Sequence, residues 1–336
     1  MKKILSLMAA LIVATLSYAQ SGLLATLSHN GEITTYYGAS ALSDAHNDAD
    51  HGDIITLSSG SFNAVNITKA ITLRGAGMEA NASTQTEATI LVGDFTLYVP
   101  SEVPQRLTIE GIYSNNNMNV GSDLKNASFL KCRFNVIRAF EEIQITNLTM
   151  IHCKVTNYLY FDRGSASIIN SVIRDPKIEN NANIEYVNSI ITRSSQFYLQ
   201  LGFSQYKNSI LVPKENARNN YLYSFTLASY CVSIGSSGMF VNIPEANNNV
   251  EMTCEEVFKT YKNNDSGTFA DDETFELTDE AKTTLLGLDG TQVGIHGGNM
   301  PFSAATTNPQ ITRCNVAAKS TADGKLSVDI TVSVPE

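Results

Sequence analysis

Short apolar runs recur through the middle of the chain at spacings of 17 to 21 residues. They lie at 71–75, 90–94, 107–111, 129–134, 150–155, 168–173, 186–191 and 206–211. Most alternate apolar with polar residues, which is the period of a β-strand. The spacing is too short for a strand with a returning helix, but it suits one coil of a solenoid whose coils pair at about 4.8 Å. The repeat predicts an all-β chain folded as a right-handed parallel β-helix.

Aligning the runs gives one residue of each coil an equivalent position. These residues are Gly75, Gly93, Gly111, Cys132, Cys153, Asn170, Asn188 and Asn208. Charged residues flank both cysteines, so we expect the charges to face solvent and the ladder to face inward. Buried asparagines need hydrogen-bond partners, which stacked asparagines can supply to one another. We interpret the cysteines as inert core thiols rather than as a thiol-based active site.

The chain begins with the features of a cleaved export signal. Two lysines are followed by an apolar run at 4–16, and Ser17-Tyr18-Ala19 places small residues where a signal peptidase reads them. The run is shorter than the roughly twenty apolar residues of a membrane span. We expect a secreted, periplasmic or outer-surface protein with no transmembrane segment.

Charge and cysteine content exclude several classes of function. The 33 acidic residues outnumber the 23 basic ones, and the formal net charge is −10, or −12 once the two signal lysines are removed. Such a chain repels nucleic acid, so we expect no nucleic-acid partner. The five cysteines form neither a disulfide framework nor a zinc-binding C-x-x-C pair. We expect a monomer with no cofactor and no metal.

The open ends of a solenoid need caps. Residues 39–47 form an amphipathic pattern, and further helices are predicted at 254–262 and from Thr278. An alternating strand at 326–334 is expected to pair with 310–317. The chain thus divides into a signal peptide (1–19), an N-terminal segment with its capping helix (20–50), the β-helix (51–245), a helical cap (246–302) and a β extension (303–336).

Two stretches resemble a known superfamily. Residues 41–77 hold a short helix, a Gly-Asp-x-Ile strand, a Gly-x-Phe turn and an Ile-Thr-Leu-Arg-Gly-x-Gly strand. This order resembles the opening of the pectin-lyase-like right-handed β-helix superfamily. Residues 275–298 resemble the closing segment of secreted β-helix proteins of gut-type Bacteroidota with no assigned activity. The resemblance implies the fold over about residues 36–300 and an association with polysaccharide, but no particular reaction.

The catalytic patterns of that superfamily's hydrolases do not appear as a set. Its polygalacturonase-like members combine N-x-D, D-D, G-H-G and R-x-K, whereas this chain has an Asp-Asp pair at 271–272, beyond the coils, and His296 in G-I-H-G-G. Inverting hydrolysis needs two carboxyl groups about 6.5–9.5 Å apart. Asp162, Asp175 and Glu142 are weak candidates, and solvated turn carboxylates are the preferred interpretation.

Lyase and metal patterns are also incomplete. Pectate lyases carry R-x-P-x-x-R, which begins here at 174–176, but Glu179 replaces the second arginine. The acidic run formed by Asp44, Asp48, Asp50 and Asp53 does not have the spacing of an EF-hand loop. We interpret it as a helix end followed by the first coil.

One group of residues predicts a binding surface. It comprises Lys131, Arg133, His152 and Lys154 on adjacent coils, with Arg106 and Glu110 one coil earlier. Stacked like charges cost free energy unless an anion shares them, so the group suits an acidic polysaccharide; solvated side chains splayed apart are the alternative. Tyrosines form a second feature, in corresponding parts of different coils: Tyr158, Tyr160, Tyr198, Tyr221 and Tyr223. Exposed tyrosines stack on sugar faces, whereas buried ones fill the core of the solenoid.

Three functions follow, in order of preference. The first is a secreted or cell-surface carbohydrate-associated protein that binds acidic polysaccharide without catalysis. The second is a divergent polysaccharide lyase, with His152, Lys154 or Arg133 as the base and the group that neutralises the uronate. The third is a structural or adhesion protein, whose strand at 326–334 offers an edge to a partner.

Overall fold

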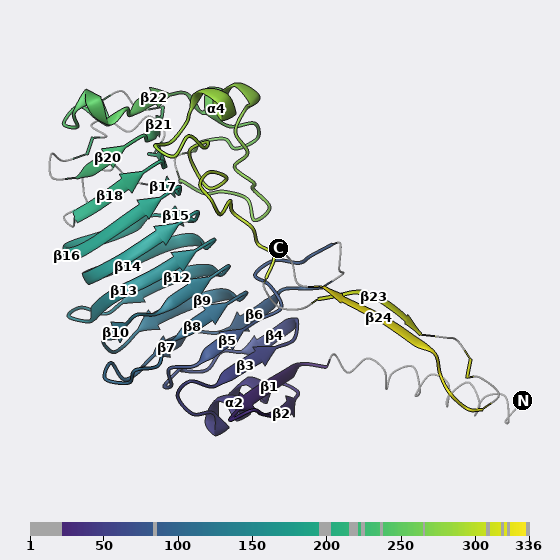
Figure 1. Cartoon of the computed structure of the whole chain (residues 1–336). Helices are drawn as coiled ribbons and strands as arrows, with labels where there is room; N and C mark the ends of the chain where they lie inside the picture. Colours follow the sequence, from purple (N-terminus) through teal and green to yellow (C-terminus); the bar gives the residue numbers. More distant parts are fainter. Residues whose placement is uncertain are drawn as a thin grey trace, which may run out of the picture.

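The computed structural model describes residues 22–82, 86–194, 203–214, 221–222, 226–235, 238–264, 266–306, 310–316, 319–320 and 323–333. These residues form a parallel β-solenoid of about nine turns with few short helices (Figure 1), which confirms the predicted fold class. No helix in this described part of the chain is long and apolar enough to cross a membrane. The predicted signal peptide, Tyr198 and Tyr223 lie outside the described residues.

The first face of the solenoid, called sheet 1, stacks one short strand segment from each coil. It is formed by β3 (Ile54–Leu57), β5 (Thr72–Arg74), β8 (Thr108–Glu110), β11 (Ser128–Leu130), β13 (Gln144–Ile151), the ends of β14 (Lys154–Ile169) and β16 (Pro176–Val187), β18 (Phe203–Lys207) and β20 (Leu227–Ser229). The middle residue of each paired segment of sheet 1 is apolar or aromatic and fully buried, from Ile55 in β3 to Ala228 in β20. The rings of Tyr186 and Tyr206 stack with centroids 5.1 Å apart, which continues the core ladder between coils.

Two further faces complete each coil. Sheet 2 contains β4 (Gly60–Asn63), β6 (Thr89–Val92), the starts of β9 (Tyr113–Val120), β12 (Arg133–Ala139) and β14, then β15 (Val172–Arg174), β17 (Ile190–Thr192), β19 (Ile210–Val212), β21 (Val232–Ile234) and β22 (Val250–Met252). The third face contains β7 (Phe95–Leu97) and later parts of β9, β12, β14 and β16; β10 (Leu124–Lys125) pairs with β13.

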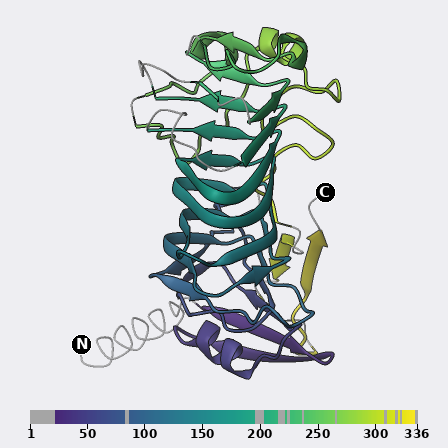
Figure 2. The ribbon, with the colours of Figure 1, turned by 90° about the vertical axis from the view of Figure 1, so that its left-hand side faces the viewer.

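The N-terminal end is closed as predicted. The antiparallel pair β1 (Leu24–His29) and β2 (Glu32–Tyr37) extends sheet 1, and the short helix α2 (Ala41–Asp48) packs beside it (Figure 2). Lys69 Nζ donates to the carbonyl oxygens of His46, Asn47 and Ala49 at 2.7, 2.8 and 2.5 Å. This ammonium group therefore satisfies carbonyls that the end of a helix leaves unpaired.

The C-terminal cover, residues 254–306, packs on the outside of sheet 2. Outward residues of that sheet, from Val172 to Val232, form a second apolar cluster with residues of the cover such as Phe258 and Tyr261. The predicted helix at 254–262 is shorter than expected: α3 spans Cys254–Val257, because the backbone of Phe258 is already extended. The helix predicted from Thr278 is present as α4 (Asp279–Thr284), with the Thr278 hydroxyl accepting from Ala281 N.

Beyond the cover the chain forms a separate hairpin. The strands β23 (Gln310–Val316) and β24 (Val328–Ser333) pair with each other, as predicted, in antiparallel orientation and project from the side of the solenoid (Figure 1). A short 3₁₀ turn, η2 (Glu245–Asn247), precedes β22.

The predicted ladder is wrong in detail, because it merges two rows that lie one residue apart. The corner row follows the last residue of sheet 1 in each coil and contains Gly75, Gly111, Lys131, His152, Asn170, Asn188, Asn208 and Tyr230. The inner row comes one residue later and contains Ile112, Cys132, Cys153, Ser171, Ser189, Ser209 and Cys231. The cysteines thus match serines, not the asparagines.

The corner row has a common backbone conformation. From Gly111 to Tyr230 its residues have φ between 43° and 63°, the left-handed region that glycine and asparagine adopt most readily. Glycine is also needed at Gly75, since a Cβ there would lie 2.4 Å from the Gly111 carbonyl oxygen. Gly93 belongs to neither row, because it follows β6 of sheet 2 and the coil that joins Thr72 to Thr108 has twice the usual length.

Candidate functional site

The four residues of the predicted anion site lie on adjacent coils as expected, and we call them the basic row. Arg133 and Lys154 are paired in sheet 2, and Lys131 and His152 lie in the corner row. Their exposure contradicts the expectation that they face solvent: Arg133, His152 and Lys154 are 8, 7 and 3% exposed. The C-terminal cover lies over them.

The cover and one loop supply the acceptors that the basic row needs. Lys154 Nζ lies 2.7 Å from Glu79 Oε1 and 3.2 Å from the Asp271 carbonyl oxygen. The Arg133 guanidinium forms an ion pair with the Asp271 carboxylate. The anions that neutralise this buried pair are therefore supplied by the chain itself.

The two corner residues of the basic row bind backbone carbonyls. His152 Nε2 lies 2.9 Å from the Met300 carbonyl oxygen, so that nitrogen carries the proton, and Lys131 Nζ donates to the Ala305 carbonyl at 2.5 Å. Burial lowers the pKa of both side chains, and the neighbouring Lys131 lowers that of His152 further. Both residues act as attachment points for the cover.

Other residues of the corner row also form hydrogen bonds with residues 285–306, which we call the strap. Asn208 Oδ1 accepts from Leu288 N at 3.0 Å, and Asn170 Nδ2 donates to the carbonyls of Ile295 and Gly297, both at 2.8 Å. The strap therefore runs down the solenoid, opposite to the direction in which the coils advance (Figures 1 and 2). The asparagines face the strap rather than the interior, which corrects the predicted inward ladder.

Only one predicted asparagine–asparagine hydrogen bond is present among the described residues, from Asn208 Nδ2 to Asn188 Oδ1 at 3.3 Å. Arg106 is also placed differently from the prediction. It is exposed, precedes β8 and donates to the Ser128 hydroxyl at 3.2 Å, so it lies on the sheet 1 side. Glu110 is buried and pairs with Arg74.

The cysteines of the inner row face the core, as predicted. Cys132, Cys153 and Cys231 are fully buried and free, and burial raises the pKa of the thiols of Cys153 and Cys231 to about 12. A thiol that resists ionisation is a poor nucleophile. The structure thus favours the core-thiol interpretation.

The acidic run near the N-terminus is bonded within the protein. Asp44 accepts from the Ser40 hydroxyl, Asp48 from the Tyr36 hydroxyl, and Asp53 from the backbone N of Asp50; Asp53 Oδ2 also lies 2.8 Å from His29 Nδ1. No group of three or more histidine, cysteine or carboxylate side chains in the described ranges is arranged to hold a metal ion.

The lyase-like residues have structural partners. Arg174 donates to the carbonyls of Thr156 and Ser266, both at 3.1 Å, and so links a coil to the cover. Asp175 Oδ1 accepts from Ser194 N at 2.8 Å. These bonds hold the turn at Pro176 rather than presenting groups to a substrate.

An open hollow of about 550 Å³ crosses the outside of sheet 1. We call it the polar trough; it is lined by Asn147, Leu148, Thr149, Ser165, Ala166, Ser167, Asn183, Glu185 and Gln205 of β13, β14, β16 and β18. Thr149, Ser167, Glu185 and Gln205 stand in register on four successive coils. Such a volume fits the range of small-ligand sites.

The hydrogen-bonding groups of the polar trough are largely available. The side chains of Thr149, Ser167, Asn183 and Gln205 have no hydrogen-bond partner within the described part of the chain. Glu185 is the one charged lining residue, and its carboxylate lies 2.6 Å from Lys207 Nζ. The trough thus offers hydroxyl and amide groups to a ligand.

A second open hollow, of about 330 Å³, lies on the same coils and is called the charged hollow. It is lined by Glu141, Glu142, Tyr160, Asp162, Arg163 and Lys177. It brings together two of the weak carboxylate candidates from the sequence, Glu142 and Asp162, whereas Asp175 lies elsewhere. Tyr160 is partly exposed here, as are Tyr158 and Tyr221 at other places.

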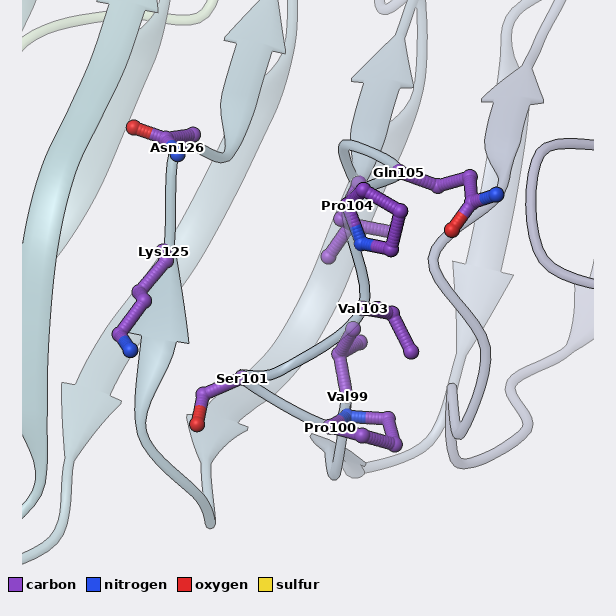
Figure 3. A pocket seen from close by; sticks show the side chains of 9 residues that line it. Val99, Pro100, Ser101, Val103, Pro104, Gln105, Lys125 and Asn126 are labelled. Carbon is purple, nitrogen blue, oxygen red and sulfur yellow. The ribbon is translucent and has the colours of Figure 1, made fainter.

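A third hollow, shown in Figure 3, is too small for a sugar chain. It lies between Val99, Pro104 and Lys125 and has a volume of about 80 Å³, well below the roughly 300 Å³ at which ligand pockets begin. Its walls are mainly the turn that leads into β8.

Comparison of the chain with protein-family models, curated proteins and solved structures gave no match. The parallel β-solenoid therefore rests on the strand pairing itself, and function has to be argued from the two open hollows.

Proposed function

We propose that this protein is an exported carbohydrate-binding protein that holds an uncharged polysaccharide in the polar trough and does not cleave it. The observation that carries the proposal is the in-register row of Thr149, Ser167, Glu185 and Gln205, which lines an open hollow. Its three uncharged side chains have no protein partner among the described residues. Coils about 4.8 Å apart repeat these groups along the axis. A regular spacing of donors and acceptors suits a ligand that is itself a repeating chain of hydroxyl groups.

Charge supports an uncharged ligand over an acidic one. Three residues of the basic row that would attract a uronate or a sulfate are buried, and two of these, Lys154 and Arg133, are paired with Glu79 and Asp271. The polar trough contains a carboxylate, Glu185, and no cationic lining residue. Because Glu185 is paired with Lys207, the trough offers a polyanion no net positive charge, and the chain as a whole carries −10.

The geometry also supports binding without catalysis. A lyase needs a base that reaches the sugar C5 proton and a group that neutralises the uronate, but Arg133, His152 and Lys154 lie under the cover. Hydrolysis by a carboxyl pair needs two such groups flanking the bond, and the polar trough has Glu185 alone among its lining residues.

The test is binding of the full mature chain to xylan, mannan, galactan and soluble cellulose derivatives, with polygalacturonate and alginate as acidic comparisons. We expect binding to at least one uncharged polysaccharide and no release of products. Ser167→Lys places a long side chain in the polar trough and should weaken binding at least tenfold. Ser61→Lys makes the same change at an exposed position of β4 and should have no effect.

Two results would refute the proposal. One is the absence of binding to every uncharged polysaccharide. The other is binding that Ser167→Lys and Ser61→Lys affect equally.

A further inference from the structure

The charged hollow follows the polar trough along a single strand. On β14, Tyr160, Asp162 and Arg163 line the charged hollow, and Ser165 and Ser167 line the trough. The strand bends between them, where the β13–β14 ladder shifts register between the pairs Ile145–Gly164 and Leu148–Ala166. The seven steps from Tyr160 to Ser167 follow about 23 Å of strand, at roughly 3.3 Å per residue, which suits an oligosaccharide rather than one sugar.

Glycine makes this bend possible. Gly164 has φ of 115°, and a Cβ at this position would lie 1.6 Å from the Ile145 carbonyl oxygen. Any side chain would therefore push β14 away from β13. Because glycine lets the two strands stay in contact, the charged hollow opens directly beside the polar trough.

Charged groups face one another in this hollow at distances longer than a good hydrogen bond. Arg163 Nε lies 3.5 Å from Asp162 Oδ2, and Arg163 Nη2 lies 3.8 Å from Glu142 Oε1; strong pairs of this kind measure about 2.7–2.9 Å. Arg163 Nε is shielded from solvent and has no hydrogen-bond partner. A ligand cannot reach this shielded nitrogen, but the Arg163 side chain is 40% exposed and that of Glu142 82% exposed, so other donors and acceptors of the group remain accessible.

The hollow is also lined by Tyr160 and Lys177, which are paired on neighbouring coils. Lys177 Nζ lies over the Tyr160 ring, 5.0 Å from its centroid. The lining residues together carry three carboxylates and two cations, so the hollow has both signs of charge and a small negative excess.

We infer that the charged hollow is a second sugar subsite, which binds two neighbouring hydroxyl groups of an uncharged sugar next in line to the one in the polar trough. This inference rests on the proposed function. A sugar hydroxyl both donates and accepts, so one hydroxyl donates to Asp162 or Glu142 while its neighbour accepts from Arg163. A uronate in the same place brings a fourth negative charge beside Glu142 and Asp162, and the subsite therefore selects against it.

The experiment measures the affinity of cello-, manno- and xylo-oligosaccharides of two to six units for the full mature chain. Affinity should rise with length until both hollows are filled. Arg163→Met should lower the affinity for the longest bound oligosaccharide at least tenfold and leave the shortest bound one unchanged. Arg138→Met is the matched control, since Arg138 is an exposed cation one coil away that does not line the hollow.

A second arm tests selection by charge. A uronate oligosaccharide should bind at least tenfold more weakly than its carboxyl-reduced form, and Glu142→Gln with Asp162→Asn should reduce that difference. If Ser167→Lys abolishes binding but Arg163→Met leaves every length unaffected, the second subsite is overturned while the proposed function stands. If no uncharged glycan binds the wild-type chain, the proposed function itself fails.

Discussion

Replacing Glu79 with glutamine removes the carboxylate that neutralises Lys154 beneath the C-terminal cover. The Lys154 side chain is 4% exposed and that of Glu79 is 29% exposed, so the lysine cannot regain the lost interaction from water. Breaking a buried pair in this way costs about 3–5 kcal/mol. Because the Asp271 carbonyl stays 3.2 Å from Lys154 Nζ, we expect Glu79→Gln to lower the free energy of unfolding by about 2–3 kcal/mol.

Removing the positive charge of Lys154 instead should lower the free energy of unfolding much less. Lys154→Met keeps the length of the side chain and its contact with Phe302, whose ring centroid lies 5.5 Å from Lys154 Nζ. The carboxylate left behind can turn to solvent, so we expect a change within about 1 kcal/mol. In the Lys154→Met background, Glu79→Gln should then have almost no further effect.

Urea unfolding of the wild type, the two single variants and the double variant measures this cycle. An exposed ion pair contributes only about 0.2–1 kcal/mol. A cost of that size for Glu79→Gln in both backgrounds would show that Lys154 is not buried by the cover, and it would refute the account of the basic row.

Two further predictions concern the corners and the buried histidines. Gly75→Ala should destabilise the protein by about 1–3 kcal/mol, since its Cβ meets a backbone carbonyl at 2.4 Å; Gly22→Ala, with nothing within 4 Å, should be neutral in the same urea assay. Burial lowers the pKa of His46 and His152, with Lys69 and Lys131 respectively as the neighbouring cations. A histidine whose pKa is lower in the folded state gives stability above its unfolded pKa of about 6.5 and loses it as pH falls. The urea midpoint should therefore fall between pH 7 and pH 5, and less so in His152→Gln; an equal fall in both proteins would contradict the assignment.

The sequence predicted the solenoid because its coils carry one local signal, the alternation of apolar and polar residues. The predicted inward ladder mixed residues of the corner row and the inner row, because these two rows are adjacent in the sequence and both contain small residues. The corner position takes glycine or asparagine in most coils for its left-handed backbone, but Lys131 and His152 occupy it in two coils. Those two coils were aligned on Cys132 and Cys153 instead, one residue too late.

No local pattern in the sequence indicates that the basic row is buried under the cover. The sequence placed the four side chains on one face correctly, since that follows from the coil period. Their acceptors come from Glu79, 75 residues before Lys154, and from Asp271, Met300 and Ala305, more than a hundred residues away along the chain. No periodicity links such distant segments, so burial under the cover could only be seen in the folded chain.

The polar trough did leave a signal in the sequence. Asn147, Ser165 and Asn183 are spaced by eighteen residues, and Thr149, Ser167 and Glu185 repeat the same spacing. These polar rows stand beside the apolar rows that revealed the coils. The charged residues that the sequence singled out lie on another face, and three of them, Arg133, His152 and Lys154, are buried.

Backbone hydrogen exchange of the mature chain, with and without the uncharged polysaccharide that binds best, tests the account most directly. We predict that the ligand slows exchange over 147–149 and 165–167 and leaves the strap unchanged. Slower exchange confined to the strap, or to the residues of the basic row, would contradict the assignment of the polar trough as the binding surface.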